Sequence, residues 1–159
     1  MLSKIMIGVL AAATIAGGAS IASAGSGDDG NDDRGRTIHF TSRTVHETDL
    51  DLGDSGFGQG DQFVFADDLF RDDEKVGTDG GSCTVVAVEG QTATVNCTAT
   101  FSLAGGQIAV QGLVEFAGNE QQPFTVAVTG GTGRYRDADG EALLEPVSDT
   151  EDKVTIRLG

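Results

Sequence analysis

The sequence predicts an all-β protein, an eight-stranded antiparallel up-and-down β-barrel, from three observations. Residues 92–103 alternate between polar and apolar side chains, which is the period of a strand with one buried and one solvated face. Glycine-containing turns on both sides of this stretch place further apolar residues opposite it. No segment has a convincing helical period, and only 2 prolines interrupt the predicted strands. Successive hairpins of this kind close most simply on themselves, because closure removes the exposed edges of the sheet.

The first hairpin around this stretch brings two cysteines together. A turn centred on Gly90 places Val85 opposite Val95 and Cys83 opposite Cys97, so that both cysteines lie on the buried face. We therefore predict a disulfide, which would stabilise the fold by about 3 kcal/mol in the chain-entropy model. A reactive thiol is the weaker alternative. No metal site is predicted, because two cysteines and two distant histidines lack any zinc-ligand spacing.

The second hairpin completes a three-stranded meander that ends near Phe116. A two-residue turn at 105–106 would place Leu103 opposite Ile108 and Phe101 opposite Val110. A slip of one residue in this pairing would turn the apolar side chains of one strand outward. The pairing therefore predicts a buried face that is continuous across three strands.

The N-terminal residues divide into two segments before the barrel. Residues 1–24 are predicted to be a secretory signal peptide, with Lys4, an apolar run and an Ala22-Ser23-Ala24 cleavage site. A transmembrane anchor is the alternative, but the run has no basic stop-transfer flank. Residues 25–36 are rich in Gly and Asp and predict a flexible acidic tail. We expect a secreted, extracellular protein, and an oxidising compartment suits the disulfide.

The barrel domain is predicted to span residues 37–159. A Gly/Asp-rich loop over 49–60 separates the first two strands, and a charged turn over 71–74 follows the second. A Gly-Gly-Thr-Gly loop at 130–133 precedes the last two strands. Outside the meander, the predicted strands lie at 37–47, 63–69, 75–88, 124–129, 141–147 and 153–158.

Charge excludes several classes of partner. The chain has 25 acidic and 10 basic residues, and its net charge is −15. Repulsion from phosphates argues against nucleic acid and anionic membranes, so we expect neither once the signal peptide is removed. Calcium is the sharper alternative for the acidic segments, but the spacing at 49–54 lacks the ligands of an EF-hand loop.

Four blocks of sequence, at 60–70, 75–83, 106–112 and 128–140, together resemble the allene oxide cyclase and dirigent barrel superfamily. The Gly130-Gly131-Thr132-Gly133 block is the most specific of them. The resemblance implies an eight-stranded barrel with an apolar lumen, no cofactor and often a homotrimer. Its plant members cyclise an unstable fatty-acid epoxide or orient phenoxy radicals and quinone methides, mainly by binding geometry and exclusion of water.

Two residues are candidates for acid/base catalysis. Parity with Phe63 and Phe65 directs Asp67 into the lumen, and the resemblance aligns it with a lumen Asn of the cyclases. His46 could exchange a proton near neutral pH. It aligns near a lumen Asn of the cyclases, but Thr44 stands where their Glu is expected. The alternatives are a solvated turn carboxylate for Asp67 and a surface side chain for His46.

The remaining candidates concern ligand binding. Aromatic residues of the strands, notably Phe63, Phe65 and Phe101, either fill the core or line a cavity. A second group at the Gly-rich loop is predicted to bracket a barrel mouth, or alternatively to form a structural ion pair beside a packed ring. It consists of Arg134, Tyr135 and Asp139. Many dirigent proteins carry an Asp and an Arg at the first and last of these positions, so the charges are exchanged here.

Three functions are consistent with this reading. The first is a protein that binds a small apolar or aromatic metabolite in its lumen and steers its conformation. The second is a cofactor-free cyclase or isomerase acting on an oxidised lipid or a phenolic intermediate. The third is a structural or interaction protein whose barrel is filled by its own side chains.

Overall fold

The computed structural model describes residues 35–53, 56–117 and 122–159. Eight antiparallel strands, in sequence order, form one closed barrel, which confirms the predicted fold class. The predicted signal peptide and nearly all of the acidic tail lie outside the described residues. The strands are β1 (Thr37–Leu50), β2 (Gln62–Arg71), β3 (Glu74–Glu89), β4 (Thr92–Leu103), β5 (Gly106–Ala117), β6 (Phe124–Gly131), β7 (Gly140–Ser148) and β8 (Glu151–Leu158).

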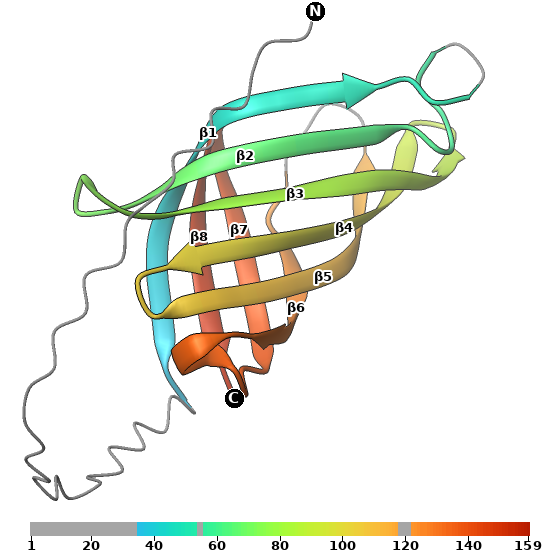
Figure 1. The fold of residues 1–159 in the computed structure, drawn as a ribbon. Helices are drawn as coiled ribbons and strands as arrows, with labels where there is room; N and C mark the ends of the chain where they lie inside the picture. The colour runs from blue at the N-terminus through green and yellow to red at the C-terminus, as the bar shows by residue number, and fades with distance from the viewer. Residues whose placement is uncertain (1–34, 54–55, 118–121) are drawn as a thin grey trace, which may run out of the picture. The chain divides into compact units, whose positions relative to one another are not determined.

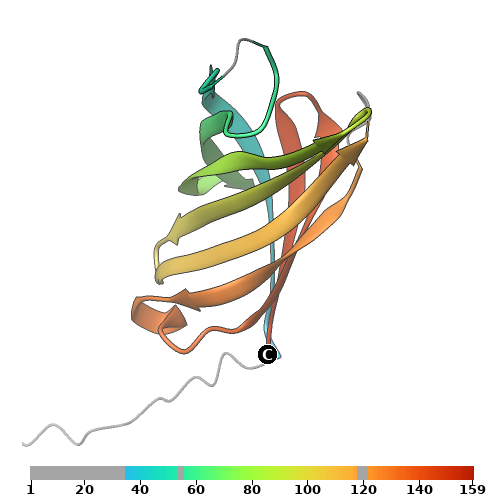
Figure 2. The same cartoon turned by 90° about the vertical axis from the view of Figure 1, so that its right-hand side faces the viewer.

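Strand β1 closes the barrel because it pairs with both the second and the last strand. Its first half pairs with β8, with Ile38 opposite Ile156, and its second half pairs with β2 as far as Leu50. Figures 1 and 2 show this long strand curving along the wall from one end of the barrel to the other. A bulge between Thr44 and His46 inserts one extra residue into β1 and reverses the facing of the residues beyond it.

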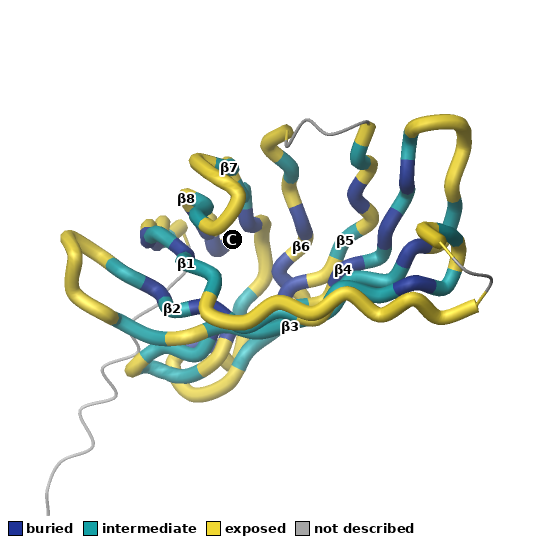
Figure 3. Tube along the Cα trace, turned by 90° about the horizontal axis from the view of Figure 1, so that it is seen from above, coloured by how far each residue is buried: buried dark blue, intermediate teal, exposed yellow. Residues whose placement is uncertain are grey.

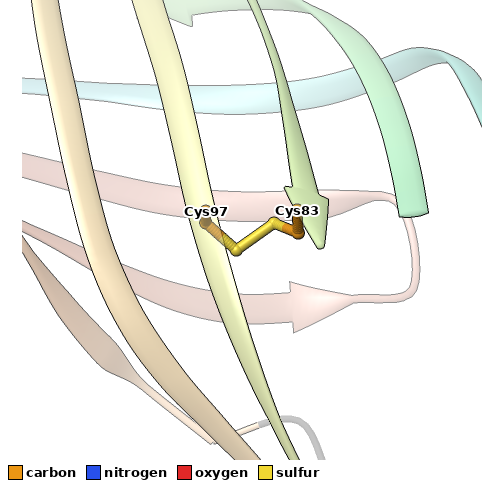
Figure 4. Close-up of a disulfide and its surroundings, with 2 residues drawn as sticks. All are labelled: Cys83 and Cys97. Atoms are coloured by element: carbon orange, nitrogen blue, oxygen red, sulfur yellow. A yellow bond between two sulfur atoms is a disulfide. The ribbon is translucent and has the colours of Figure 1, made fainter. Parts of the chain in front are cut away.

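The predicted first hairpin is confirmed. Val85 lies opposite Val95 and Cys83 opposite Cys97. The cysteines form a disulfide across 14 residues with a Cα–Cα distance of 4.0 Å (Figure 4). A bulge between Val85 and Ala87 takes up one residue before the turn, so the pairing on the buried face is unchanged.

The predicted second hairpin is wrong by two residues. Phe101 lies opposite Ile108, and Leu103 lies opposite Gly106. Gly106 belongs to the strand rather than the turn because a loop crosses directly above it: a Cβ added there, at φ +134°, would lie 2.1 Å from the carbonyl oxygen of Thr132. A shift of two residues preserves which face each side chain occupies, so the buried face of the meander is as predicted.

One end of the barrel is filled by its own side chains. Leu69, Ile108 and Ile156 are fully buried there, and the rings of Phe40 and Phe101 meet edge to face at 5.3 Å. A short 3-10 helix, η1 (Gly133–Tyr135), covers this end and buries the ring of Tyr135. Figures 1 and 2 both place η1 near the C-terminus, and we name this part of the barrel the closed half.

The alternation of buried and exposed residues follows the strands around the barrel. Figure 3 shows it plainly along β5 and β6, where dark and light segments succeed one another. Inward side chains therefore come from alternate positions of every strand, as the period-2 pattern requires. Within the described residues, no helix is long and apolar enough to cross a membrane.

Candidate functional site

The other part of the barrel, which we name the open half, contains a cavity of about 250 Å³. The cavity lies toward the β7–β8 turn, at the end opposite η1, because successive turns of an up-and-down barrel alternate between its ends. Its wall combines aromatic rings, carboxyl groups and the disulfide. The lining side chains used below are Ser42, Glu47, Phe63, Phe65, Asp67, Asp79, Cys83, Cys97, Phe101, Phe116, Phe124, Asp149 and Asp152.

Asp67 is the most buried carboxyl group of this wall. It is only 8% exposed, and its Oδ2 accepts a hydrogen bond of 2.9 Å from the hydroxyl of Ser42 on the neighbouring strand. Its Oδ1 is buried, and no group other than the neighbouring carboxyl of Asp79 donates to it. Since a buried carboxylate oxygen with too few donors is costly, a donor on a bound molecule would be favourable here.

Asp79 lies directly opposite Asp67, on β3. Burial raises the pKa of Asp79 to about 8, and the neighbouring Asp67 carboxylate and a hydrogen bond with it act in the same direction. At neutral pH the Asp79 carboxyl therefore holds a proton, and the two carboxyls together carry one negative charge. The Oδ1 of Asp79 is also buried, and no group other than the paired Asp67 carboxyl contacts it. One acid and one base thus face the same cavity.

A third carboxyl extends this cluster to the last strand. Asp152 on β8 pairs in register with Ser42 on β1, so the four polar side chains follow one another over adjacent strands. Burial raises the pKa of Asp152, and the negative charge of Asp67 raises it further. We name Asp67, Asp79 and Asp152 the carboxyl cluster.

Aromatic rings form much of the remaining wall. Phe63, Phe65 and Phe101 line the cavity, as predicted for a ligand-binding lumen. Nearer the mouth, Phe116 and Phe124 meet edge to face at 6.0 Å. These rings offer flat apolar surface on which a planar ligand can pack.

The structure does not bring His46 to the cavity. The β1 bulge makes Val45 an extra residue, so His46 lies on the exposed outer surface and Glu47 takes the inward position. The candidate rests on its alignment near a lumen Asn of the cyclases, and the structure shows the alternative, a surface side chain. The bulge that turns His46 outward has no clear signal in the sequence.

Arg134, Tyr135 and Asp139 are also absent from the cavity wall. They lie in the β6–β7 connection at the closed half, where Tyr135 is 5% exposed within the core and the other two are exposed. Among the described residues no ion pair joins Arg134 to Asp139. The group covers the end of the barrel opposite the cavity instead of bracketing its mouth.

Sequence reasoning missed two members of the carboxyl cluster. Parity with Cys83 directs Asp79 inward, and parity with Val154 and Ile156 directs Asp152 inward, so the signal was present. Asp79 lies in a glycine-rich part of β3, and Asp152 follows an acidic turn, and in both settings an Asp is usually solvated. In the described part of the chain, no group of His, Cys, Asp and Glu has the arrangement of a metal site.

Comparisons with known proteins agree with this architecture. The model of the allene oxide cyclase barrel like domain matches residues 41–158. The structure of a pyocyanin demethylase is 31% identical with a TM-score of 0.70, and the match covers 77% of this chain and 99% of that one.

More distant structures share the fold alone. The Diels Alderase AbmU from Streptomyces koyangensis is 14% identical with a TM-score of 0.59, over 77% of this chain and 68% of that one. The pterocarpan synthase dirigent protein PsPTS1 is 18% identical with a TM-score of 0.57, over 77% of this chain and 91% of that one. No curated protein matches the chain. The family match spans nearly the whole barrel, and the chain therefore belongs to the allene oxide cyclase barrel like family.

Proposed function

We propose that this barrel binds a small aromatic molecule in its open half and catalyses proton transfer on it, as a cofactor-free isomerase or cyclase. The observation that carries the proposal is the Asp67–Asp79 pair. It places two hydrogen-bonded carboxyls, one of them protonated, against the same apolar cavity, with buried Oδ1 atoms that no group outside the pair contacts. Pairs of carboxyls whose environments separate their protonation states are typical of acid/base sites.

The two carboxyls can exchange protons without any net consumption. Asp79 gives its proton to one atom of the ligand and becomes a carboxylate. Asp67 removes a proton from a second atom of the ligand and becomes a carboxylic acid. Transfer of that proton from Asp67 to Asp79 across the pair restores the starting state, so the ligand is rearranged with its composition unchanged.

Binding without turnover is the second candidate. It is supported by the aromatic wall, which offers a ligand flat apolar surface without requiring a reaction. The 31% identical relative, a pyocyanin demethylase, supports a bound ligand but favours turnover. The cavity of about 250 Å³ argues against the third function, a barrel filled by its own side chains. The distinction between binding and catalysis therefore rests on the carboxyl pair.

The test begins by identifying a ligand. Mass spectrometry of molecules that copurify with the protein, and titration with pyocyanin as a probe, should give a compound that binds stoichiometrically. Asp67→Asn should then reduce turnover of an identified substrate by about 10²-fold or more. The matched control is Asp68→Asn, since the neighbouring Asp68 is bound to Lys75 at 2.6 Å and does not line the cavity. Unchanged turnover in Asp67→Asn would remove it as an acid or base.

Export and assembly are proposals of the same kind. We propose cleavage after Ala24 and secretion, which N-terminal sequencing of the protein from culture medium tests; an uncleaved N-terminus contradicts it. A homotrimer would cover apolar side chains that the barrel leaves exposed on its outer surface, such as Val64, Val88 and Leu113. Light scattering after gel filtration tests this, and a monomeric mass contradicts it.

A further inference from the structure

The cavity wall carries an unbalanced negative charge. The three residues of the carboxyl cluster occupy its interior, and Glu47 and the exposed Asp149 add two more carboxyls. Among the described residues that line the cavity there is no Lys, Arg or His. Carboxylates enclosed by protein are costly unless a countercharge or hydrogen-bond donors reach them. The open half therefore lacks a positive partner that its own wall could have supplied.

Two arginines lie elsewhere, already bound to other carboxylates. Arg43 contacts Glu151 at 2.9 Å, and Arg157 contacts Glu141 at 2.8 Å, both at the surface. Neither arginine lines the cavity. In these contacts, the arginines bind carboxylates on the outside of the barrel, whereas the carboxyls inside it have no basic partner.

The aromatic part of the wall also favours a positively charged ligand. The face of a phenyl ring has a negative potential and attracts cations, more strongly where water is excluded. Phe63, Phe65 and Phe101 lie in the same cavity as the cluster, and Phe116 and Phe124 continue this surface toward the mouth. A ligand that is both flat and positively charged can use the rings and the carboxyls together.

We propose that the open half of the lumen selects organic cations, in particular a flat aromatic ring bearing a fixed positive charge, over neutral and anionic molecules of the same size. This inference rests on the proposed function only in placing the ligand in this cavity. It specifies the class of ligand, which the proton-transfer proposal leaves open. The buried carboxyl oxygens of Asp67 and Asp79 are the groups that the cation approaches, and it takes the place of the proton that the pair shares.

Binding of a cation should also be linked to protons. The groups that face Asp79 are Asp67 on β2, Asp152 on β8 and the uncharged Phe101 on β4. No positive side chain of the cavity wall competes with the ligand. Because the pKa of Asp79 is about 8, a cation should bind more tightly as pH rises from 6 to 9 and should displace the Asp79 proton.

The experiment compares three bicyclic probes by calorimetry on the purified full-length chain. N-methylquinolinium is the cation, 2-methylquinoline is a neutral analogue of similar size, and 1-naphthoate is the anion. At pH 8.5 we expect the cation to bind at least about tenfold more tightly than the neutral probe, and the anion to bind most weakly. Asp79→Asn, which resembles the protonated carboxyl, should abolish the increase of cation affinity with pH, whereas Asp68→Asn should retain it.

A second variant guards against misfolding within the cluster. Glu47→Gln combined with Asp149→Asn removes the two exposed carboxyls and should weaken the cation by about threefold, with little effect on 2-methylquinoline. Equal affinity for cation and neutral probe would overturn the cation inference and leave the proton-transfer proposal standing. Unchanged turnover in Asp67→Asn with retained cation preference would overturn the proton-transfer proposal and leave the cation inference standing. Failure of all three probes to bind would overturn the cation inference.

Discussion

The closed and open halves of the barrel are built from the same alternating strands but serve different purposes. In the closed half, inward positions carry Leu69, Ile108 and Ile156, which fill the interior. In the open half, inward positions of β2, β3 and β8 carry the carboxyl cluster and line a cavity. Period-2 alternation decides only that a side chain points inward; its volume and charge decide whether that half is a core or a site.

The difference also separates stability from chemistry. Filling the closed half contributes burial and packing, which are the main favourable terms in folding. The open half places carboxyls where burial opposes their ionisation. These groups lower the stability of the fold, and binding of a ligand can offset that loss. Substitutions in the two halves should therefore differ in size and even in sign.

The largest effect is expected from removing a ring of the closed half. Phe40→Ala should lower the free energy of unfolding by about 3–5 kcal/mol, because Phe40 is buried and packs edge to face on Phe101. Phe116→Ala, at the wall of the open half, should cost clearly less since the ring already borders empty space. Urea denaturation measures both. Equal losses would mean that the cavity side is packed as tightly as the core.

Removing the disulfide should have the next largest effect. The double variant Cys83→Ala and Cys97→Ala should lose about 3 kcal/mol, because the closed loop restricts the unfolded chain. The native barrel should keep its shape, since the two residues remain paired by the strands. Reductant should destabilise the wild type by a similar amount and leave the variant unchanged. A reductant-insensitive wild type would contradict the role of the bridge.

Replacing a buried carboxyl should stabilise the protein. In the unfolded chain Asp79 ionises near 3.8, whereas in the barrel its pKa is about 8. Between these values the folded state retains a proton that the unfolded state has lost, so stability falls as pH rises and levels off above about pH 8. Asp79→Asn does not titrate. It should therefore gain about 1–3 kcal/mol at pH 8 and much less at pH 4.5.

Thermal unfolding of Asp79→Asn across this pH range, beside Asp68→Asn, measures the gain. Asp68 faces outward toward Lys75, so its replacement removes a negative charge without relieving burial, whereas Asp79→Asn leaves the net charge of the folded protein unchanged below about pH 8. A gain in Asp79→Asn that is independent of pH would contradict the protonated state assigned to this carboxyl. An equal gain in both variants would point to the overall negative charge of the chain as the cause.

The sequence was sufficient for the fold and for the inward position of Asp67, whose catalytic role stays a prediction. Alternation between residues 92 and 103 fixed the inward face of β4, and the match of Cys83 with Cys97 followed from it. The same parity placed Asp67 correctly in the cavity wall. These features depend on local pattern and on neighbouring strands, which a sequence displays directly.

The errors have a different physical origin. The bulge in β1 turns His46 to the outer surface, against its alignment near a lumen Asn, and the register at Leu103 was shifted because the distant Thr132 loop packs on Gly106. The cluster itself joins β2, β3 and β8, and its unusual protonation arises only when closure brings those strands around one cavity. Such contacts between remote segments leave no periodic signal in the chain.

The smallest effect is expected where a carboxylate lies outside the barrel. Glu141 on β7 pairs with Arg157 on β8 at 2.8 Å, and both side chains are about half exposed. Exposed pairs contribute little because water and salt screen them, so Glu141→Gln should change the free energy of unfolding by about 0.5 kcal/mol or less. Urea denaturation at low and high salt measures this, and the difference should shrink further at high salt. A loss above about 1.5 kcal/mol would mean that outer ion pairs, as well as the closed half, hold the strands together. The effect of a carboxyl on the free energy of unfolding would then depend less on whether it lies inside or outside the barrel than the comparison of the two halves predicts.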